Sequence, residues 1–294
     1  MRRFLICLSC LLALPLQSAM LADDIRNQYL PGEYQTILVG DEDMPVFSGE
    51  PTTSLSRGVA LIFTDTGYQG LTLNNARALA VKLNHRGWHT LVVPAATLGV
   101  DVSAPVSQTT EPSQPGEINE VAPAIIEASG ATSMHPRAIA REAMIDPASN
   151  RSVVALLANA VFQHIETIPG FRLVISQGMS AAQLIALTSA DILPPPDGMV
   201  VISPYWPQSE ANGAIPAQLA ATEFPILDLQ FPINTQWTAN SAAKQKLAAT
   251  QALKLHYRNK ALTTPLFQAT NSSDTIFSRT LSKEIYGWVN HLGW

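Results

Sequence analysis

The 294-residue sequence contains little cysteine and little charge. Its two cysteines, Cys7 and Cys10, both lie within the first ten residues. The rest of the chain therefore offers no disulfide framework, no cysteine-based zinc site and no cysteine nucleophile. Charged residues make up 14% of the chain, whereas about 25% is usual in globular proteins.

Basic clusters are also missing from the body of the chain. The 18 Lys and Arg are outnumbered by 23 Asp and Glu, and the net charge is −5. Proteins that follow a phosphate backbone need a basic surface, so nucleic acid is not an expected partner. Hydrophobic residues nevertheless reach 47%, and this content predicts a folded domain with a large core rather than a disordered chain.

The first 22 residues have the pattern of a secretory signal peptide. Arg2 and Arg3 precede an uncharged apolar run over residues 4–16, which is too short to span a bilayer core of about 30 Å. We expect cleavage after Ala22, although Ala19 is an alternative and neither site has the usual small residue at position −3. Removing residues 1–22 takes away both cysteines and two arginines but no acid, so the net charge changes from −5 to −7. The mature protein is expected to be periplasmic or secreted, with no stable membrane span.

Residues 23–294 are predicted to form a single α/β domain with a doubly wound, mostly parallel sheet. Short β-type runs at residues 34–39 and 44–48 flank a turn-rich stretch and predict an N-terminal β-hairpin. The unbroken apolar run at residues 58–63, the helical spacing at 74–85 and the strand at 89–93 form a βαβ unit. Further strands are expected at 172–175, 198–203, 225–230 and 253–258, and further helices at 152–165, 181–190, 215–222, 244–252 and 278–292.

Residues 101–136 interrupt this alternation. The segment is rich in Ser, Thr, Pro, Gln and Glu and has one short apolar patch. We interpret it as a flexible insertion or loop, which is either functional or loosely tethered.

The segment LVISQGMSAA, residues 173–182, has the pattern of a nucleophile elbow, in which a buried strand turns sharply into a helix. Two registers compete. The first places Gly178 at the tip, and the second reads Gly178 to Ala182 as G-x-S-x-A with Ser180 as nucleophile. We favour Gly178, because the apolar run of the strand ends at Ile175 and the elbow should begin at Ser176. A glycine has no hydroxyl, so this register removes covalent catalysis.

The positions expected for the other two members of a catalytic triad lack the required groups. In this fold an acid follows the nucleophile in the chain, and a histidine base follows the acid. The loop after the strand at 225–230 offers Asn234, while Asp228 lies inside the strand. The loop before the last helix contains Asn271 and no histidine. The degenerate triad positions are therefore predicted to be Gly178, Asn234 and Asn271.

Two motifs near the start of the sheet resemble an exported α/β-hydrolase-like family of unknown function from Gram-negative bacteria. An apolar strand ends in Asp65-Thr66-Gly67, and a second strand begins with Gly87-Trp88-His89-Thr90-Leu91. This family often has glycine at the elbow tip, as at Gly178. The resemblance implies an α/β-hydrolase-like fold with no established activity.

We therefore expect a protein that binds a small-molecule ligand or an envelope protein and has no complete triad. Ligands of open α/β sheets bind at the carboxyl ends of the strands. The predicted binding residues are Thr66, Gly67, Gly178, Met179 and Tyr205, although Asp65 and Tyr205 also suit purely structural roles in turns and loops. The histidines show no metal-ligand spacing, so neither a metal nor a cofactor is expected.

Two alternatives remain open. The protein is an ester or acyl hydrolase if Ser180 is the nucleophile and His256 or His291 is the base. It is an envelope interaction module if residues 101–136 act as a docking arm.

Overall fold

The computed structural model describes residues 18–65, 70–95, 146–231, 236–239, 241–263 and 275–294. The predicted insertion at 101–136 lies outside these residues. So do Thr66, Gly67, Asn234 and Asn271.

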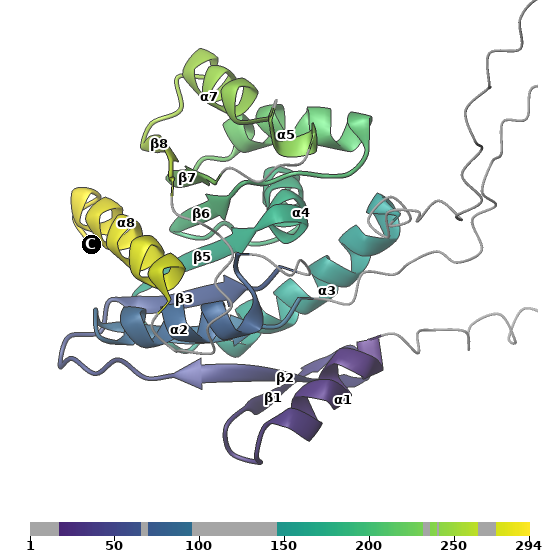
Figure 1. Cartoon of the computed structure of the whole chain (residues 1–294), viewed down its shortest axis with the longest axis vertical. Coiled ribbons are helices and arrows are strands. Elements are labelled where there is room, and N and C mark those ends of the chain that lie inside the picture. Colours follow the sequence, from purple (N-terminus) through teal and green to yellow (C-terminus); the bar gives the residue numbers. More distant parts are fainter. Residues whose placement is uncertain (1–17, 66–69, 96–145, 232–235, 240, 264–274) are drawn as a thin grey trace, which may run out of the picture.

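Eight strands form one sheet in the order β1-β2-β4-β3-β5-β6-β7-β8 (Figure 1). The pairs β1–β2 and β2–β4 are antiparallel, and the other neighbours are parallel. The strands are β1 Gln35–Val39, β2 Glu42–Gly49, β3 Gly58–Phe63, β4 Trp88–Val93, β5 Phe171–Gln177, β6 Gly198–Ile202, β7 Ile226–Gln230 and β8 Tyr257–Ala261. The predicted mostly parallel sheet with an N-terminal hairpin is confirmed.

Helices cover both faces of the sheet. They are α1 Ser18–Gln28, α2 Leu73–Asn84, α3 Pro147–His164, α4 Gly178–Ser189, α5 Ser209–Ala221, α6 Gln236–Ala239, α7 Ser241–Gln251 and α8 Ile276–His291. Side chains of α1, α2 and α8 belong to the core on one face, and side chains of α3, α4, α5 and α7 belong to the core on the other. Within the described residues, no helix combines the length and the apolar character needed to cross a bilayer.

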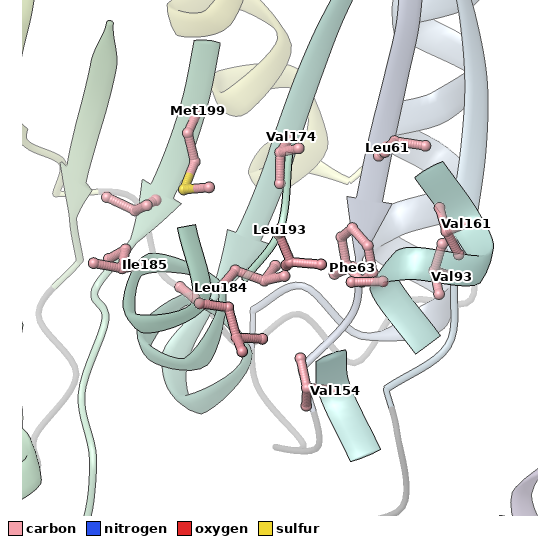
Figure 2. Packing of buried hydrophobic residues seen from close by; sticks show 14 of the residues in the cluster. Leu61, Phe63, Val93, Val154, Val161, Val174, Leu184, Ile185, Leu193 and Met199 are labelled. Atoms are coloured by element: carbon pink, nitrogen blue, oxygen red, sulfur yellow. The ribbon is translucent and has the colours of Figure 1, made fainter. Parts of the chain in front are cut away.

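The strand β3 shows why its apolar run is unbroken. Val59, Leu61 and Phe63 point into the core with α3 and α4, while Ala60 and Ile62 point into the core with α2 and α8. Figure 2 shows Leu61 and Phe63 packed with apolar side chains of the first core. Because both faces of a parallel strand are buried, no polar alternation appears in the sequence.

The predicted strand at 253–258 is wrong in its bounds. Leu253 and His256 have φ values of +51° and +58°, which belong to the left-handed region rather than to extended backbone. These residues form the turn that follows α7, and β8 begins only at Tyr257. Among the described strands, β8 pairs only with β7, so it forms one edge of this sheet.

Candidate functional site

The turn from β5 into α4 lies at the carboxyl edge of the sheet. β5 ends at Gln177, and Gly178 begins α4 with a φ of +59°. Residues with side chains rarely adopt this conformation, and a nucleophile elbow is a sharp, strained turn of this kind. The structure thus places Gly178 at the tip of the elbow and Ser180 one residue beyond Met179, inside the helix.

Asp65 fills the space above Gly178. It lies two residues after the end of β3 and is buried, and its backbone N–H donates to the carbonyl of Leu71. A Cβ atom on Gly178 would lie 2.6 Å from Asp65 Oδ2 and 3.0 Å from its Cγ. The Asp65 carboxylate therefore occupies the position from which a side chain at the elbow tip would project.

A hydrogen bond from Leu71 to Gln177 links the segment after β3 to the turn between β5 and α4. The buried Oε1 of Gln177 accepts this bond of 2.8 Å from the backbone N–H of Leu71. Gly70 has a φ of +83°, and a Cβ atom there would overlap the amide of Gln177. The close approach of these two segments thus depends on glycine at both Gly70 and Gly178.

Ser180 makes a hydrogen bond to the backbone. Its half-buried Oγ donates to the carbonyl oxygen of Thr64 at 3.0 Å. Thr64 Oγ1 in turn accepts from the N–H of Ala95 at 2.7 Å. A general base must accept the proton of a nucleophilic hydroxyl, and a peptide carbonyl is too weak a base for this role.

The remaining described residues of the predicted binding site are buried. Met179 and Tyr205 are 3% and 7% exposed and belong to the core with α3 and α4. The Tyr205 N–H donates to the Gly178 carbonyl at 3.4 Å, so the loop after β6 contacts the elbow. The structure brings Gly178, Met179 and Tyr205 together, but Met179 and Tyr205 pack into the core.

Asp228 lies within β7 and is completely buried. Its carboxylate accepts hydrogen bonds from Tyr257 Oη at 2.6 Å, Asn259 Nδ2 at 2.8 Å and Gln230 Nε2 at 2.5 Å. Burial raises the pKa of the Asp228 carboxyl to about 6, although these hydrogen bonds act in the opposite direction. All three donors come from β7 and β8, so Asp228 joins the two strands.

Every histidine in the described part of the chain lies at the amino end of the sheet, opposite the elbow. His85, His164 and His291 lie at the ends of helices α2, α3 and α8, while His89 and His256 lie at the beginnings of β4 and β8. These helices return the chain from the carboxyl edge to the amino edge of the sheet. The described residues also contain no group of three His, Cys, Asp or Glu side chains placed to hold a metal ion.

The strand register measures how far His256 lies from Ser180. Gln177 at the end of β5 pairs with Ile202 of β6, which pairs with Leu229 of β7. Leu229 pairs with Lys260 of β8, so Lys260 and Gln177 lie at the same level of the sheet. His256 lies four residues before Lys260, which is about 13 Å along the strand. Three strand spacings of about 4.8 Å also separate β8 from β5. The structure does not bring His256 and Ser180 together, and it places His291 at the same distant end of the sheet.

The family with the description "Protein of unknown function (DUF3530)" matches residues 9–291. The chain belongs to this family. No curated protein matches it.

Several solved esterase structures share the fold of this DUF3530 protein. Thermogutta terrifontis esterase 2 phosphorylated by paraoxon has a TM-score of 0.55 at 9% identity, and the match covers 91% of this chain and 97% of that one. A carboxylesterase from Lactobacillus plantarum WCFS1 has a TM-score of 0.54 at 8% identity, with 90% and 98% covered. The esterase domain of a Rhodothermus marinus protein has a TM-score of 0.53 at 11% identity, with 88% and 97% covered. These similarities show the α/β-hydrolase fold, as predicted.

The contact between Asp65 and Gly178 was harder to predict from the sequence than the fold. Asp65 was expected to brace its own turn, whereas its carboxylate lies against a residue more than 100 positions later in the DUF3530 chain. A glycine at the tip of an expected elbow was the one available signal, because it leaves room for a neighbouring side chain. Which side chain takes that room depends on the pairing of β3 with β5.

Proposed function

We propose that this protein is an exported, non-catalytic binding protein built on the α/β-hydrolase fold. The observation that carries the proposal is the Asp65 carboxylate, which stands where a nucleophile at the elbow tip would project its side chain. A serine at this tip would overlap the carboxylate, and Gly178 itself has no nucleophilic atom.

The surroundings of Ser180 also argue against covalent catalysis. Its hydroxyl proton is directed to the carbonyl of Thr64, and the histidines of the described residues lie at the other end of the sheet. An acyl-transfer reaction needs a base within hydrogen-bond distance of the nucleophile, about 2.6 to 3.2 Å. Neither His256 nor His291 meets this requirement by its place in the fold.

Export is proposed from the sequence of the first 22 residues. The basic start, the apolar run of 13 residues and the acidic Asp23 and Asp24 that follow support a cleaved signal peptide. The expected destination is the periplasm or the medium.

The test of non-catalytic function uses a fluorophosphonate probe and a panel of short- and long-chain ester substrates on the purified protein. We expect no labelling and no hydrolysis above the level of Ser180→Ala, because the Ser180 hydroxyl donates to a peptide carbonyl and no histidine of the described residues lies near it. A known serine esterase serves as the positive control. Labelling that is lost in a folded Ser180→Ala protein would overturn the proposal and establish an ester or acyl hydrolase with Ser180 as its nucleophile.

A further inference from the structure

The turn between α7 and β8, residues 252–256, carries two strongly exposed leucines. Leu253 is 82% exposed and Leu255 is 78% exposed. A third exposed leucine, Leu247, lies on the outer side of α7 shortly before the turn. Single exposed leucines are ordinary in proteins, whereas two within three residues of one turn bring their apolar surfaces together. The α7–β8 turn is therefore an apolar projection from the domain.

Leu253 occupies a backbone position that usually belongs to glycine. The N–H of Lys254 donates to the carbonyl of Ala249 at 3.0 Å, and the N–H of Leu253 donates to the carbonyl of Thr250 at 3.1 Å. These two bonds define the Schellman motif at the end of a helix, in which the position of Leu253 takes a positive φ. Leu253 has a φ of +51°. Both this conformation and the exposure disfavour a leucine, so a role in binding accounts for it better than a role in folding.

Lys254, between the two leucines, holds the turn in place. Its half-buried side chain reaches Thr222, where Nζ donates to the carbonyl oxygen and, at 3.0 Å, to Oγ1. The same Nζ lies 5.8 Å from the centre of the Phe224 ring. Because Lys254 is bound to the domain, the leucines on either side of it are presented to solvent by a fixed backbone. A surface that is already ordered loses little conformational entropy when it binds.

The segment around the turn is basic, although the chain as a whole has a net charge of −5. Residues 241–263 contain no Asp or Glu, and their basic residues are Lys244, Lys246, Lys254, Arg258 and Lys260. Two acids of neighbouring elements face this group, since Glu284 of α8 pairs with Lys260 at 2.7 Å and Glu223 lies near Lys254. The other three basic side chains are exposed and form no ion pair with the described residues. The apolar projection thus lies within a positively charged surface.

The α7–β8 turn is also well placed to meet a flat surface. Figure 1 shows α7 and β8 at one end of the longest axis of the molecule, with α1 and β1 at the other end. The turn lies at the amino end of the sheet, because β8 begins directly after it at Tyr257. The elbow at Gly178 lies at the carboxyl edge, so contact through the turn leaves the elbow uncovered.

We propose that the α7–β8 turn binds the surface of a bilayer that contains anionic phospholipids. Leu253 and Leu255 enter the boundary between headgroups and acyl chains, and Lys244, Lys246 and Arg258 face the lipid phosphates. Exposed apolar side chains within a basic surface are the combination that binds a protein to an anionic interface without spanning it. An apolar pocket of a protein partner would suit the leucines but would not require the surrounding positive charge. This binding goes beyond the proposed non-catalytic function and does not depend on it.

The experiment follows an environment-sensitive NBD fluorophore on Leu255→Cys in the purified full chain. Cys7→Ser and Cys10→Ser leave one labelling site whether or not residues 1–22 are cleaved. Leu38→Cys carries the same fluorophore as a control, since Leu38 is 64% exposed in β1 at the opposite edge of the sheet. With vesicles of equal parts phosphatidylcholine and phosphatidylglycerol, we expect the emission to shift to shorter wavelength at position 255 and not at position 38. Vesicles of phosphatidylcholine alone should bind at least about tenfold more weakly, because they lack the anionic lipid that attracts the basic residues.

Variants that carry the fluorophore at position 255 separate binding from folding. Leu253→Gly should weaken vesicle binding by about tenfold through loss of one buried leucine. The same change should leave the unfolding temperature unchanged or raise it, because glycine suits this backbone position. Lys244→Gln together with Lys246→Gln should weaken binding to the anionic vesicles by about tenfold or more. The matched control is Leu30→Gly, the same substitution at a leucine that is 73% exposed after α1, and it should bind like the unaltered protein.

Several results would overturn the inference. These are the absence of an emission shift at position 255 with anionic lipid in large excess, equal shifts at positions 255 and 38, and unchanged vesicle binding by Leu253→Gly. Binding of poly-L-glutamate without binding of vesicles would also overturn it and would indicate an acidic protein partner. None of these results bears on Ser180, whose labelling by the fluorophosphonate probe tests the non-catalytic function separately.

Discussion

The position of Gly178 requires both a positive φ and the absence of a side chain. Its φ of +59° lies in the left-handed region, and its missing side chain makes room for the Asp65 carboxylate. A residue with a Cβ atom loses about 1 to 2 kcal/mol in this conformation. The close approach of Asp65 adds to this loss unless the carboxylate moves.

Gly178→Ala is therefore expected to lower the free energy of unfolding by about 1 to 3 kcal/mol, because backbone strain and overlap with Asp65 act together. Urea denaturation followed by circular dichroism measures this change. A second substitution, Asp65→Ala in the Gly178→Ala background, should restore part of the loss by removing the overlap.

Gly213→Ala provides the matched control for this substitution. Gly213 lies within α5, and a Cβ atom there meets nothing within 4 Å. The same change should raise stability by up to about 1 kcal/mol, since alanine favours a helix. If both variants lost equal stability, the special geometry of Gly178 would be refuted.

At the scale of elements, a buried carboxyl links β7 to β8. Asp228 accepts from Tyr257 and Asn259, and Gln230 also donates to Gln245 of α7 at 2.9 Å. The pKa of Asp228 is about 6 in the folded protein, above its ordinary value of 3.8. Folding therefore favours the protonated carboxyl, and its contribution to stability is fully present below about pH 4 and lost as pH rises through 6.

We expect the difference in unfolding free energy between the unaltered protein and Asp228→Asn to fall by about 2 to 3 kcal/mol from pH 4 to pH 7, since one pKa unit is worth about 1.4 kcal/mol. Urea denaturation at half-unit pH steps measures the difference. Glu166→Gln, which removes an exposed acid at the end of α3, should leave the pH dependence largely unchanged. A constant difference for Asp228→Asn would contradict the raised pKa.

The elements themselves were largely predictable from the sequence, because their signals are local. The run at Gly58–Phe63 and the periodic apolar residues of α2 gave correct positions. The start of α3 was placed too late, since Asp146 caps the helix and Pro147 begins it before its first apolar residue. The contact between the Asp65 carboxylate and Gly178 was not predicted. It depends on the pairing of β3 with β5, two strands more than 100 residues apart in the chain, and no local sequence pattern indicates that pairing.

At the scale of the whole molecule, cleavage of the expected signal peptide would leave residues 23–294 as the mature protein. The predicted cleavage point after Ala22 lies inside α1. The part of α1 that would remain still contacts the fold, because Ile25 is 2% exposed and Arg26 donates to the carbonyl of Asp43 at 2.7 Å. A cut there leaves these contacts in place.

Expression of the full chain in a Gram-negative host should yield a periplasmic or secreted protein that begins at Asp23, as N-terminal sequencing would show. Leu12→Arg, which interrupts the apolar run, should block export and leave the uncleaved chain inside the cell. A full-length chain that stays in the membrane fraction would instead indicate an uncleaved anchor.

The strand β8 forms an edge of the sheet at which two copies of the molecule could pair. Among the described residues, no strand pairs with β8 on the side away from β7. Such edges promote aggregation by pairing with another chain. A symmetric antiparallel pairing centred on Asn259 would place Arg258 of one copy opposite Lys260 of the other. Like charges directly opposite each other disfavour pairing. Arg258 and Lys260 thus disfavour aggregation of the protein through this edge of the sheet.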